Sequence, residues 1–130
     1  MRETGSGVRQ RAGLMRRFDP AERYRILRDF RAVVNMTRRQ LSAWLDTDES
    51  HEVGYRYSPH EESVGHRSGR RVIEILGKRQ AELSDLDIAH ARKVVGYVRR
   101  HLAQRPHKDI THTRWAYSLK NWGHDPTKNT

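Results

Sequence analysis

The clearest pattern along the chain is a recurrence of apolar residues every three to four positions, which predicts amphipathic α-helices. The first stretch of this kind follows Asp19 and Pro20, a pair typical of a helix start, and it should end near Asn35. Its predicted buried stripe consists of Ile26, Leu27, Phe30, Val33 and Val34. We therefore expect the folded part of the chain to begin with this helix.

Two capping boxes mark the starts of further helices. Thr37 is followed three residues later by Gln40, and Ser84 by Asp87, so each hydroxyl can accept a hydrogen bond from an amide that would otherwise lack a partner. The first box should open a brief second helix. The second should open the clearest helix of the chain, which runs to about residue 105 and is stopped by Pro106.

Two more helices complete the predicted set. One covers residues 63–79, and the other begins at Thr111 or Thr113 and ends at Gly123. No stretch alternates apolar and polar residues for long enough to require a strand, although residues 53–58 are where a short one would fit. The sequence thus predicts an all-α protein, a compact bundle of about five helices.

The predicted helices also divide the chain into parts. Residues 1–18 combine glycines with arginines and should form a disordered basic arm. Residues 19–126 should form a single helical domain, and residues 127–130 a frayed tail. Within the domain, residues 46–62 are rich in acidic residues and contain Gly54 and Pro59, which predicts a long acidic loop between the second and third helices.

Two glycines in the third predicted helix allow two interpretations. Gly65 and Gly69 fall on the same side as Ser68 and Val72, so they can let another helix approach closely, and we expect that partner to be the fourth helix. Alternatively, the amides after Ser63 can bind a phosphate beside the nearby arginines. The Gly-Lys-Ser/Thr ending of a Walker loop is missing, and packing is the favoured interpretation.

Charge distinguishes this chain from an ordinary small protein. It has 26 Lys and Arg against 16 Asp and Glu, a formal net charge of +10. A positive field of this size attracts polyanions, and nucleic acid is the first partner to consider. The alternative is that the charge only keeps the protein in solution.

Some classes of protein are disfavoured by what the sequence lacks. Cysteine is absent, so no disulfide, thiol nucleophile or thiolate zinc site is expected, and a cytoplasmic location is favoured. No apolar run approaches the roughly 20 residues of a membrane helix, and the N-terminus lacks the apolar middle of a secretory signal. We expect no membrane partner.

The eight histidines do not form a recognisable metal or catalytic motif. His90, Tyr97 and His101 lie along one flank of the fourth predicted helix, with His66 expected nearby, and they can form a polar seam, a ligand site or half-exposed surface. The polar seam is favoured, because buried imidazole needs only a hydrogen-bond partner. We expect no enzyme, metal or cofactor, and an enzyme using these histidines remains the weakest hypothesis.

The basic residues of the third and fourth predicted helices are the candidate binding surface. Eleven Lys and Arg against four acidic residues lie between Ser63 and Lys108, and phosphate binding needs such a field and little else. Tyr55, Tyr57, Trp115 and Tyr117 are further candidates, for stacking on unpaired bases. The predicted nucleic-acid contacts are His66, Arg67, Arg70, Arg71, Lys78, Arg92, Lys93, Arg99 and Arg100.

Four segments of the chain resemble a known family. They are TRRQLSAWLDTDESHEVG, ESVGHRSGRRVIEILGKR, HARKVVGYVRRHLAQRP and THTRWAYSLKNWGHDP, and together they are similar to the bacterial and fungal family called domain of unknown function 3140. The resemblance covers about residues 19–126. It implies no established activity or site, although some members carry a DNA-binding label.

The sequence therefore favours a small basic DNA-binding protein that contacts the phosphate backbone without sequence preference. Its expected partner is double-stranded DNA, and it would then be associated with the nucleoid. The alternative is a helical adaptor that docks a protein partner through the acidic loop 46–62. The sequence leaves open the choice between DNA and RNA and the oligomeric state.

Overall fold

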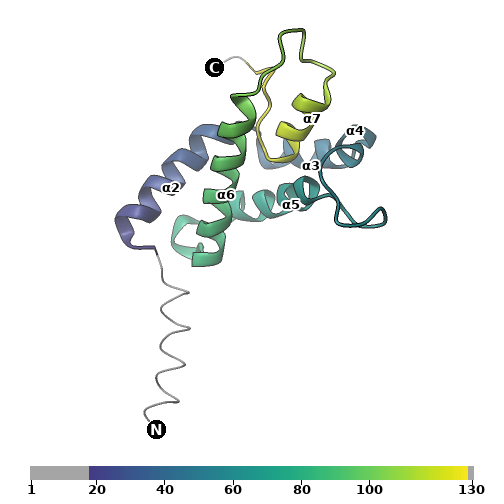
Figure 1. Ribbon diagram of the computed structural model, residues 1–130. Coiled ribbons are helices and arrows are strands. Elements are labelled where there is room, and N and C mark those ends of the chain that lie inside the picture. Colours follow the sequence, from purple (N-terminus) through teal and green to yellow (C-terminus); the bar gives the residue numbers. More distant parts are fainter. Residues whose placement is uncertain (1–17, 129–130) are drawn as a thin grey trace.

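The computed structural model describes residues 18–128, and its regular elements in that range are all helical (Figure 1). The expected basic arm therefore lies outside the described residues, apart from Phe18. The helices are α2 (Pro20–Val33), α3 (Arg38–Leu45), α4 (Asp48–Glu52), α5 (Val64–Leu76), the 3₁₀ turn η1 (Gln80–Glu82), α6 (Asp85–Leu102) and α7 (Arg114–Asn121).

The predicted helix starts are formed as the sequence indicated. The hydroxyl of Thr37 accepts a hydrogen bond from the amide of Gln40 at 3.1 Å, and that of Ser84 accepts one from Asp87 at 3.1 Å. Asp19 caps α2 in the same way, through the amide of Glu22. Local sequence alone thus determines where these helices begin.

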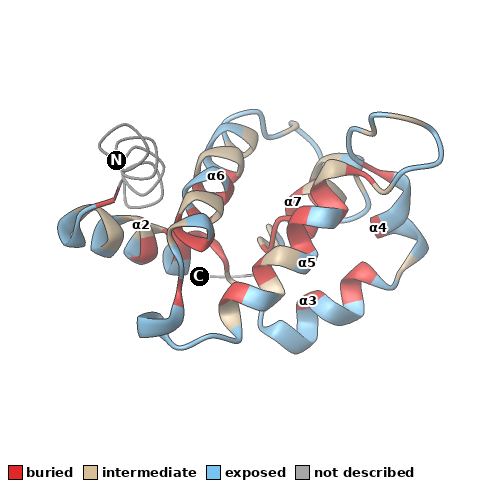
Figure 2. Ribbon diagram, turned by 90° about the horizontal axis from the view of Figure 1, so that it is seen from below, coloured by how far each residue is buried: buried red, intermediate tan, exposed pale blue. Residues whose placement is uncertain are grey.

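The helices pack around a single core. Helix α2 lies along α6, while α5 contacts α3, α6 and α7 (Figure 1). Figure 2 shows the buried residues on the sides of the helices that face one another, with exposed residues outside. Leucine and β-branched side chains from four of these helices are fully buried, and they include Leu41, Val72, Ile88, Val94, Val98 and Leu119. The described helices span no membrane, because none combines the necessary length and apolar character.

The acidic segment 46–62 is partly helical, which corrects the expectation of one long loop. Thr47 caps α4 by accepting a hydrogen bond from the amide of Ser50 at 3.1 Å. Ser50 is fully buried and donates through its hydroxyl to Asn121 of α7 at 2.5 Å. A tertiary contact therefore holds a helix of five residues whose sequence has no apolar stripe. Residues 53–63 remain as the connection to α5, and they form no strand.

The close approach allowed by Gly65 and Gly69 is real, but the partner helix differs from the expected one. A Cβ atom on Gly69 would lie 2.5 Å from the carbonyl oxygen of Asn121 and 2.8 Å from Cδ2 of Leu45. One on Gly65 would lie 2.9 Å from Nε1 of Trp122. The glycines thus admit the end of α7 and a side chain of α3, whereas α6 was the predicted neighbour.

The C-terminal end of the longest helix also differs from expectation. Helix α6 ends at Leu102, three residues earlier than predicted. Pro106 has no amide hydrogen that could extend the helix to the carbonyl of Leu102. The preceding carbonyl, of His101, accepts a hydrogen bond from the indole Nε1 of Trp115 at 2.8 Å. In the expected frayed tail, Thr127 and Lys128 are held by hydrogen bonds, and residues 129–130 lie outside the described range.

Candidate nucleic-acid interface

Helices α5 and α6 carry eight of the nine predicted contact residues and Lys78 follows α5, but the structure does not bring the nine onto one surface. One is buried, several are paired with carboxylates, and the cations of α6 point in two directions. The expectation of a shared basic exterior is therefore wrong. A specific contact explains the position of each group of residues.

His66 is the buried member and cannot contact a phosphate from this position. Only 7% of its surface is exposed. Its Nε2 lies 2.8 Å from the carbonyl oxygen of Leu45, and its Nδ1 contacts a carboxylate oxygen of Glu62. Its ring also stacks on that of His51, with centroids 4.3 Å apart. His66 therefore joins α5 to α3 and to the acidic segment.

Glu62 also pairs closely with one of the predicted arginines and lies near a second. Nε of Arg70 donates to its carboxylate at 2.9 Å, and Nε of Arg67 lies 3.9 Å from it. The hydrogen bond from Arg70 is the main cause of a lowered Glu62 pKa, about 2 against an ordinary 4.5. Glu62 thus remains ionised at neutral pH. Arg70 is paired closely, whereas Arg67 is exposed and only loosely held.

Asp87, in the first turn of α6, pairs with two more of the predicted cations, near the C-terminal end of α5. Its carboxylate accepts hydrogen bonds from Lys78 at 2.8 Å and from Arg71 at 3.0 Å. Burial by itself would raise the pKa of Asp87, but the hydrogen bonds from Lys78, the Ser84 amide and Arg71 outweigh it and hold the pKa well below its usual value. Lys78 is therefore a structural cation that joins α5 to α6.

The four cations of α6 lie along two different edges of the helix. On the edge beside α2, the guanidinium of Arg92 lies over the Phe18 ring, 5.4 Å from its centroid, and that of Arg99 lies 3.5 Å from Asp29. Lys93 and Arg100 lie one residue further along, which turns them about 100° around the helix. Neither forms an ion pair within the described residues.

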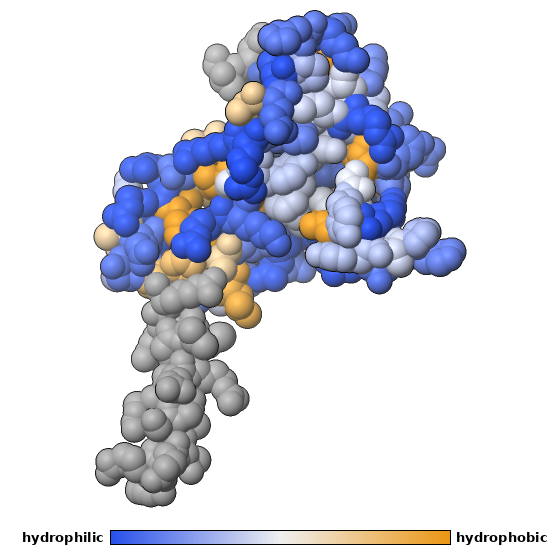
Figure 3. Space-filling model, viewed as in Figure 1, coloured by the Kyte–Doolittle hydropathy of each residue, from blue (hydrophilic) through white to orange (hydrophobic). Residues whose placement is uncertain are grey.

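Lys93 borders two adjoining cavities between α6, α5 and the segment before α5, and Arg100 borders the smaller of them. The larger has a volume of about 410 Å³ and includes Tyr57 in its lining; the smaller, of about 230 Å³, includes Tyr55. Both are lined by Lys93 and Trp122. We call this continuous depression the basic groove, and define it by Arg67, Arg70, Arg71, Lys93, Arg100, Tyr55, Tyr57, Tyr97 and Trp122. Figure 3 shows strongly hydrophilic side chains along α6 beside a paler area.

Three rings of a stacked column, His90, Tyr97 and Trp122, form the floor of the groove. Tyr97 stacks on Trp122 with centroids 4.2 Å apart and on His101 at 5.1 Å, and His90 and Trp115 extend the column at its two ends. The predicted flank of His90, Tyr97 and His101 is thus a packed seam of rings. No group of three metal-ligating side chains occurs among residues 18–128, and His66 is engaged elsewhere.

His90 stands at the inner end of this floor. Its Nε2 lies 2.9 Å from the hydroxyl oxygen of Ser68 on α5, and Arg71 and Lys93 are near it. Burial, followed by the positive charges of Arg71 and Lys93, lowers the pKa of His90 to about 4 from 6.5. The ring is therefore neutral at pH 7 and leaves the groove's positive charge to the Lys and Arg side chains.

This lowered pKa predicts a pH-dependent stability. Between about pH 6.5 and pH 4 the unfolded chain binds a proton at His90 more readily than the folded one does, so the free energy of unfolding should fall as the pH falls through this window. Urea denaturation at pH 7.5 and pH 5 should show a smaller difference for His90→Gln than for the parent. His107→Gln, in an exposed position, is the control. An unchanged difference in His90→Gln would contradict the assignment.

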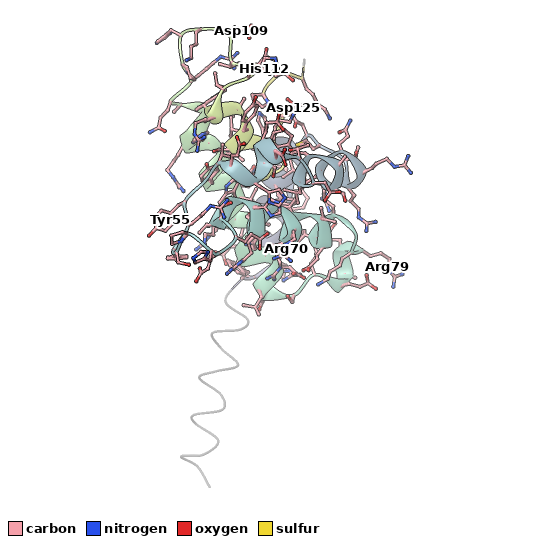
Figure 4. All side chains as sticks on the ribbon, turned by 90° about the vertical axis from the view of Figure 1, so that its right-hand side faces the viewer. Tyr55, Arg70, Arg79, Asp109, His112 and Asp125 are labelled. Atoms are coloured by element: carbon pink, nitrogen blue, oxygen red, sulfur yellow. The ribbon has the colours of Figure 1, made fainter. Side chains whose placement is uncertain are left out.

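Tyr55 and Tyr57 are the groove residues that helical periodicity did not identify. They are 67% and 72% exposed, and their rings meet edge to face with centroids 5.1 Å apart. Figure 4 shows Tyr55 projecting from one side of the molecule and Arg79 from the opposite side. The only sequence signal was the presence of aromatic residues in a segment without a helical pattern. Trp115 and Tyr117, the other stacking candidates, are half-buried.

The family of the chain follows from comparison with known proteins. A family model described as Protein of unknown function (DUF3140) matches residues 29–120, which is well over half of the chain. The chain belongs to this family. Neither a curated protein nor a solved structure matches it. The match lies within the range of the sequence resemblance and includes every groove residue except Trp122, but the description of the DUF3140 family assigns no activity to them.

Proposed function

We propose that this protein is a small, non-enzymatic DNA-binding protein that contacts the phosphate backbone through the basic groove, without sequence preference. The observation that carries the proposal is the position of Lys93 and Arg100. Neither has a carboxylate partner in the described residues, and both line the groove, whereas Arg92 lies over the Phe18 ring and Arg99 beside Asp29. Arg67 and Arg71 add positive charge to its larger cavity. A nucleoid location would follow from this proposal.

The chemistry of the groove suits phosphate binding. Arginine and lysine supply several N–H donors, and phosphate-backbone recognition requires a concentrated positive field and little defined geometry. The neighbouring carboxylates are Glu62, Glu74 and Asp87, three against the five groove cations, so the groove stays positive. Four predicted residues are not part of the proposed contact, because His66 is buried, Lys78 is paired with Asp87, and Arg92 and Arg99 lie on the other edge of α6.

A salt titration tests the proposal. Fluorescence anisotropy with labelled DNA should show binding at about 50 mM salt and a steep loss of affinity toward about 200 mM, since phosphate contacts release condensed counterions. Scrambling the DNA sequence should leave the affinity unchanged. Absence of binding at the low salt concentration, with the protein shown to be folded by circular dichroism, would contradict the proposal.

A second candidate function is the helical adaptor. Asp46, Asp48, Glu49 and Glu52 are exposed on and beside α4, and none has an ion-pair partner within residues 18–128. A basic protein surface can dock on such an acidic face. Pull-down with and without nuclease separates the two functions, because a partner that nuclease removes was bridged by nucleic acid. Retention of one defined partner after nuclease treatment, and its loss in a variant with these four positions neutralised, would favour the adaptor.

A further inference from the structure

The wall of the basic groove opposite α6 carries two exposed aromatic rings that phosphate binding alone does not use. Tyr55 and Tyr57 are more than two-thirds exposed, although large aromatic side chains are usually buried in the core or used in interfaces. Each lines one of the two cavities that Lys93 joins. The rings and the cations therefore face the same depression.

The segment that carries these rings is fixed to the body at several points. Val53 is fully buried, and the amide of Val64 donates to the carbonyl of Tyr55 at 2.8 Å. The guanidinium of Arg56 bridges the carbonyls of His51 and Glu61, and that of Arg114 donates to the carbonyl of Glu52 at 2.9 Å. The two tyrosines are thus held beside the groove before any ligand binds, which reduces the ordering cost of binding.

We propose that the groove binds a single, unpaired strand, whose bases stack on Tyr55 and Tyr57 while its phosphates contact Lys93, Arg100 and Arg67. This inference rests on the proposed function and specifies its ligand. Every base has a face that can stack on a tyrosine ring, so this contact requires no sequence preference. It also replaces double-stranded DNA, the partner expected from the sequence, by single-stranded nucleic acid.

The distribution of charge favours one strand over a duplex. A duplex offers two backbones and hides the base faces inside its stack, so exposed tyrosines find nothing to stack on. The groove presents its unpaired cations along one edge of α6, whereas Arg92 and Arg99 are occupied on the other edge. One line of cations beside two rings matches one backbone with its bases turned to the same side.

Anisotropy with a labelled single strand of about 12 nucleotides, compared with the same sequence as a duplex at equal salt, tests this inference. The single strand should bind more tightly. The double variant Tyr55→Ala/Tyr57→Ala should weaken binding of the single strand by about tenfold or more and leave the duplex little affected. Tyr24→Ala, which removes a 62% exposed tyrosine of α2 outside the groove, is the matched control and should bind as the parent does.

Replacing both tyrosines by phenylalanine keeps the ring faces and should retain the affinity. The inference is overturned if the duplex binds as tightly as the single strand, or if the double alanine variant binds like Tyr24→Ala. In either case, a salt-dependent affinity that falls on substitution of Lys93 and Arg100 would leave the proposed function standing. Failure of both nucleic acids to bind would overturn the two proposals together.

Discussion

Asn121→Ala is expected to lower the free energy of unfolding by about 3 to 5 kcal/mol. Asn121 is fully buried, and its Oδ1 accepts hydrogen bonds from Nε1 of Trp44 at 2.7 Å and from the hydroxyl of Ser50. Its Nδ2 donates to the carbonyl of Ser50 at 3.1 Å. Alanine would leave three buried polar groups without partners, and each such group costs about 1 to 3 kcal/mol.

Urea denaturation followed by circular dichroism measures this loss. Ser50→Ala removes only one of the three hydrogen bonds and should lower the free energy of unfolding by about 1 to 2 kcal/mol. Asn121→Ala should therefore be the less stable of the two variants. Gln104→Ala, in an exposed position after α6, should change it by less than about 0.5 kcal/mol. If Asn121→Ala were as stable as Gln104→Ala, the buried network would not be what holds α4 and α3 to α7.

The second large effect concerns a glycine. Gly69→Ala should lower the free energy of unfolding by about 2 to 3 kcal/mol, because the new methyl group would lie 2.5 Å from the Asn121 carbonyl oxygen and 2.8 Å from Leu45. Helix propensity alone predicts the opposite, a gain of about 1 kcal/mol. The sign of the effect therefore reports the close packing of α5 on α7 and α3.

Gly96 provides a matched control within α6. A methyl group there would meet only the end of the flexible Arg100 side chain, with the nearest atom at 3.0 Å. Gly96→Ala should therefore be neutral or stabilising by up to about 1 kcal/mol. Thermal or urea denaturation of the two variants checks the contrast, and a similar gain in both would show that Gly69 has room for a side chain.

Local signals in the sequence were sufficient for much of the fold. The capping boxes at Thr37 and Ser84 fixed the starts of α3 and α6, because their hydrogen bonds join residues only three positions apart. Helix α4 was missed because it depends on Ser50 reaching Asn121, a residue 71 positions away. Periodicity identified the packed face of α5 but not which helix would cover it.

The candidate site was harder to predict, for the same reason. A helical projection shows that Arg71 and Arg99 point outward, but it does not show that Asp87 and Asp29 arrive from other helices to pair with them. Likewise, nothing local revealed that His66 would find the Leu45 carbonyl. Contacts of this kind left five of the nine predicted residues in the groove, and two of those five, Arg70 and Arg71, are paired with carboxylates.

The central claim is that polyanions bind along the groove edge of α6 and not along its α2 edge. Its most direct test compares Lys93→Ala/Arg100→Ala with Arg92→Ala/Arg99→Ala, two variants that remove the same charge from the same helix. The slope of log affinity against log salt should fall in magnitude by about 1.5 in the first variant and stay unchanged in the second. Equal changes in both variants would contradict the claim, because the whole basic surface and not the groove would then be the binding site.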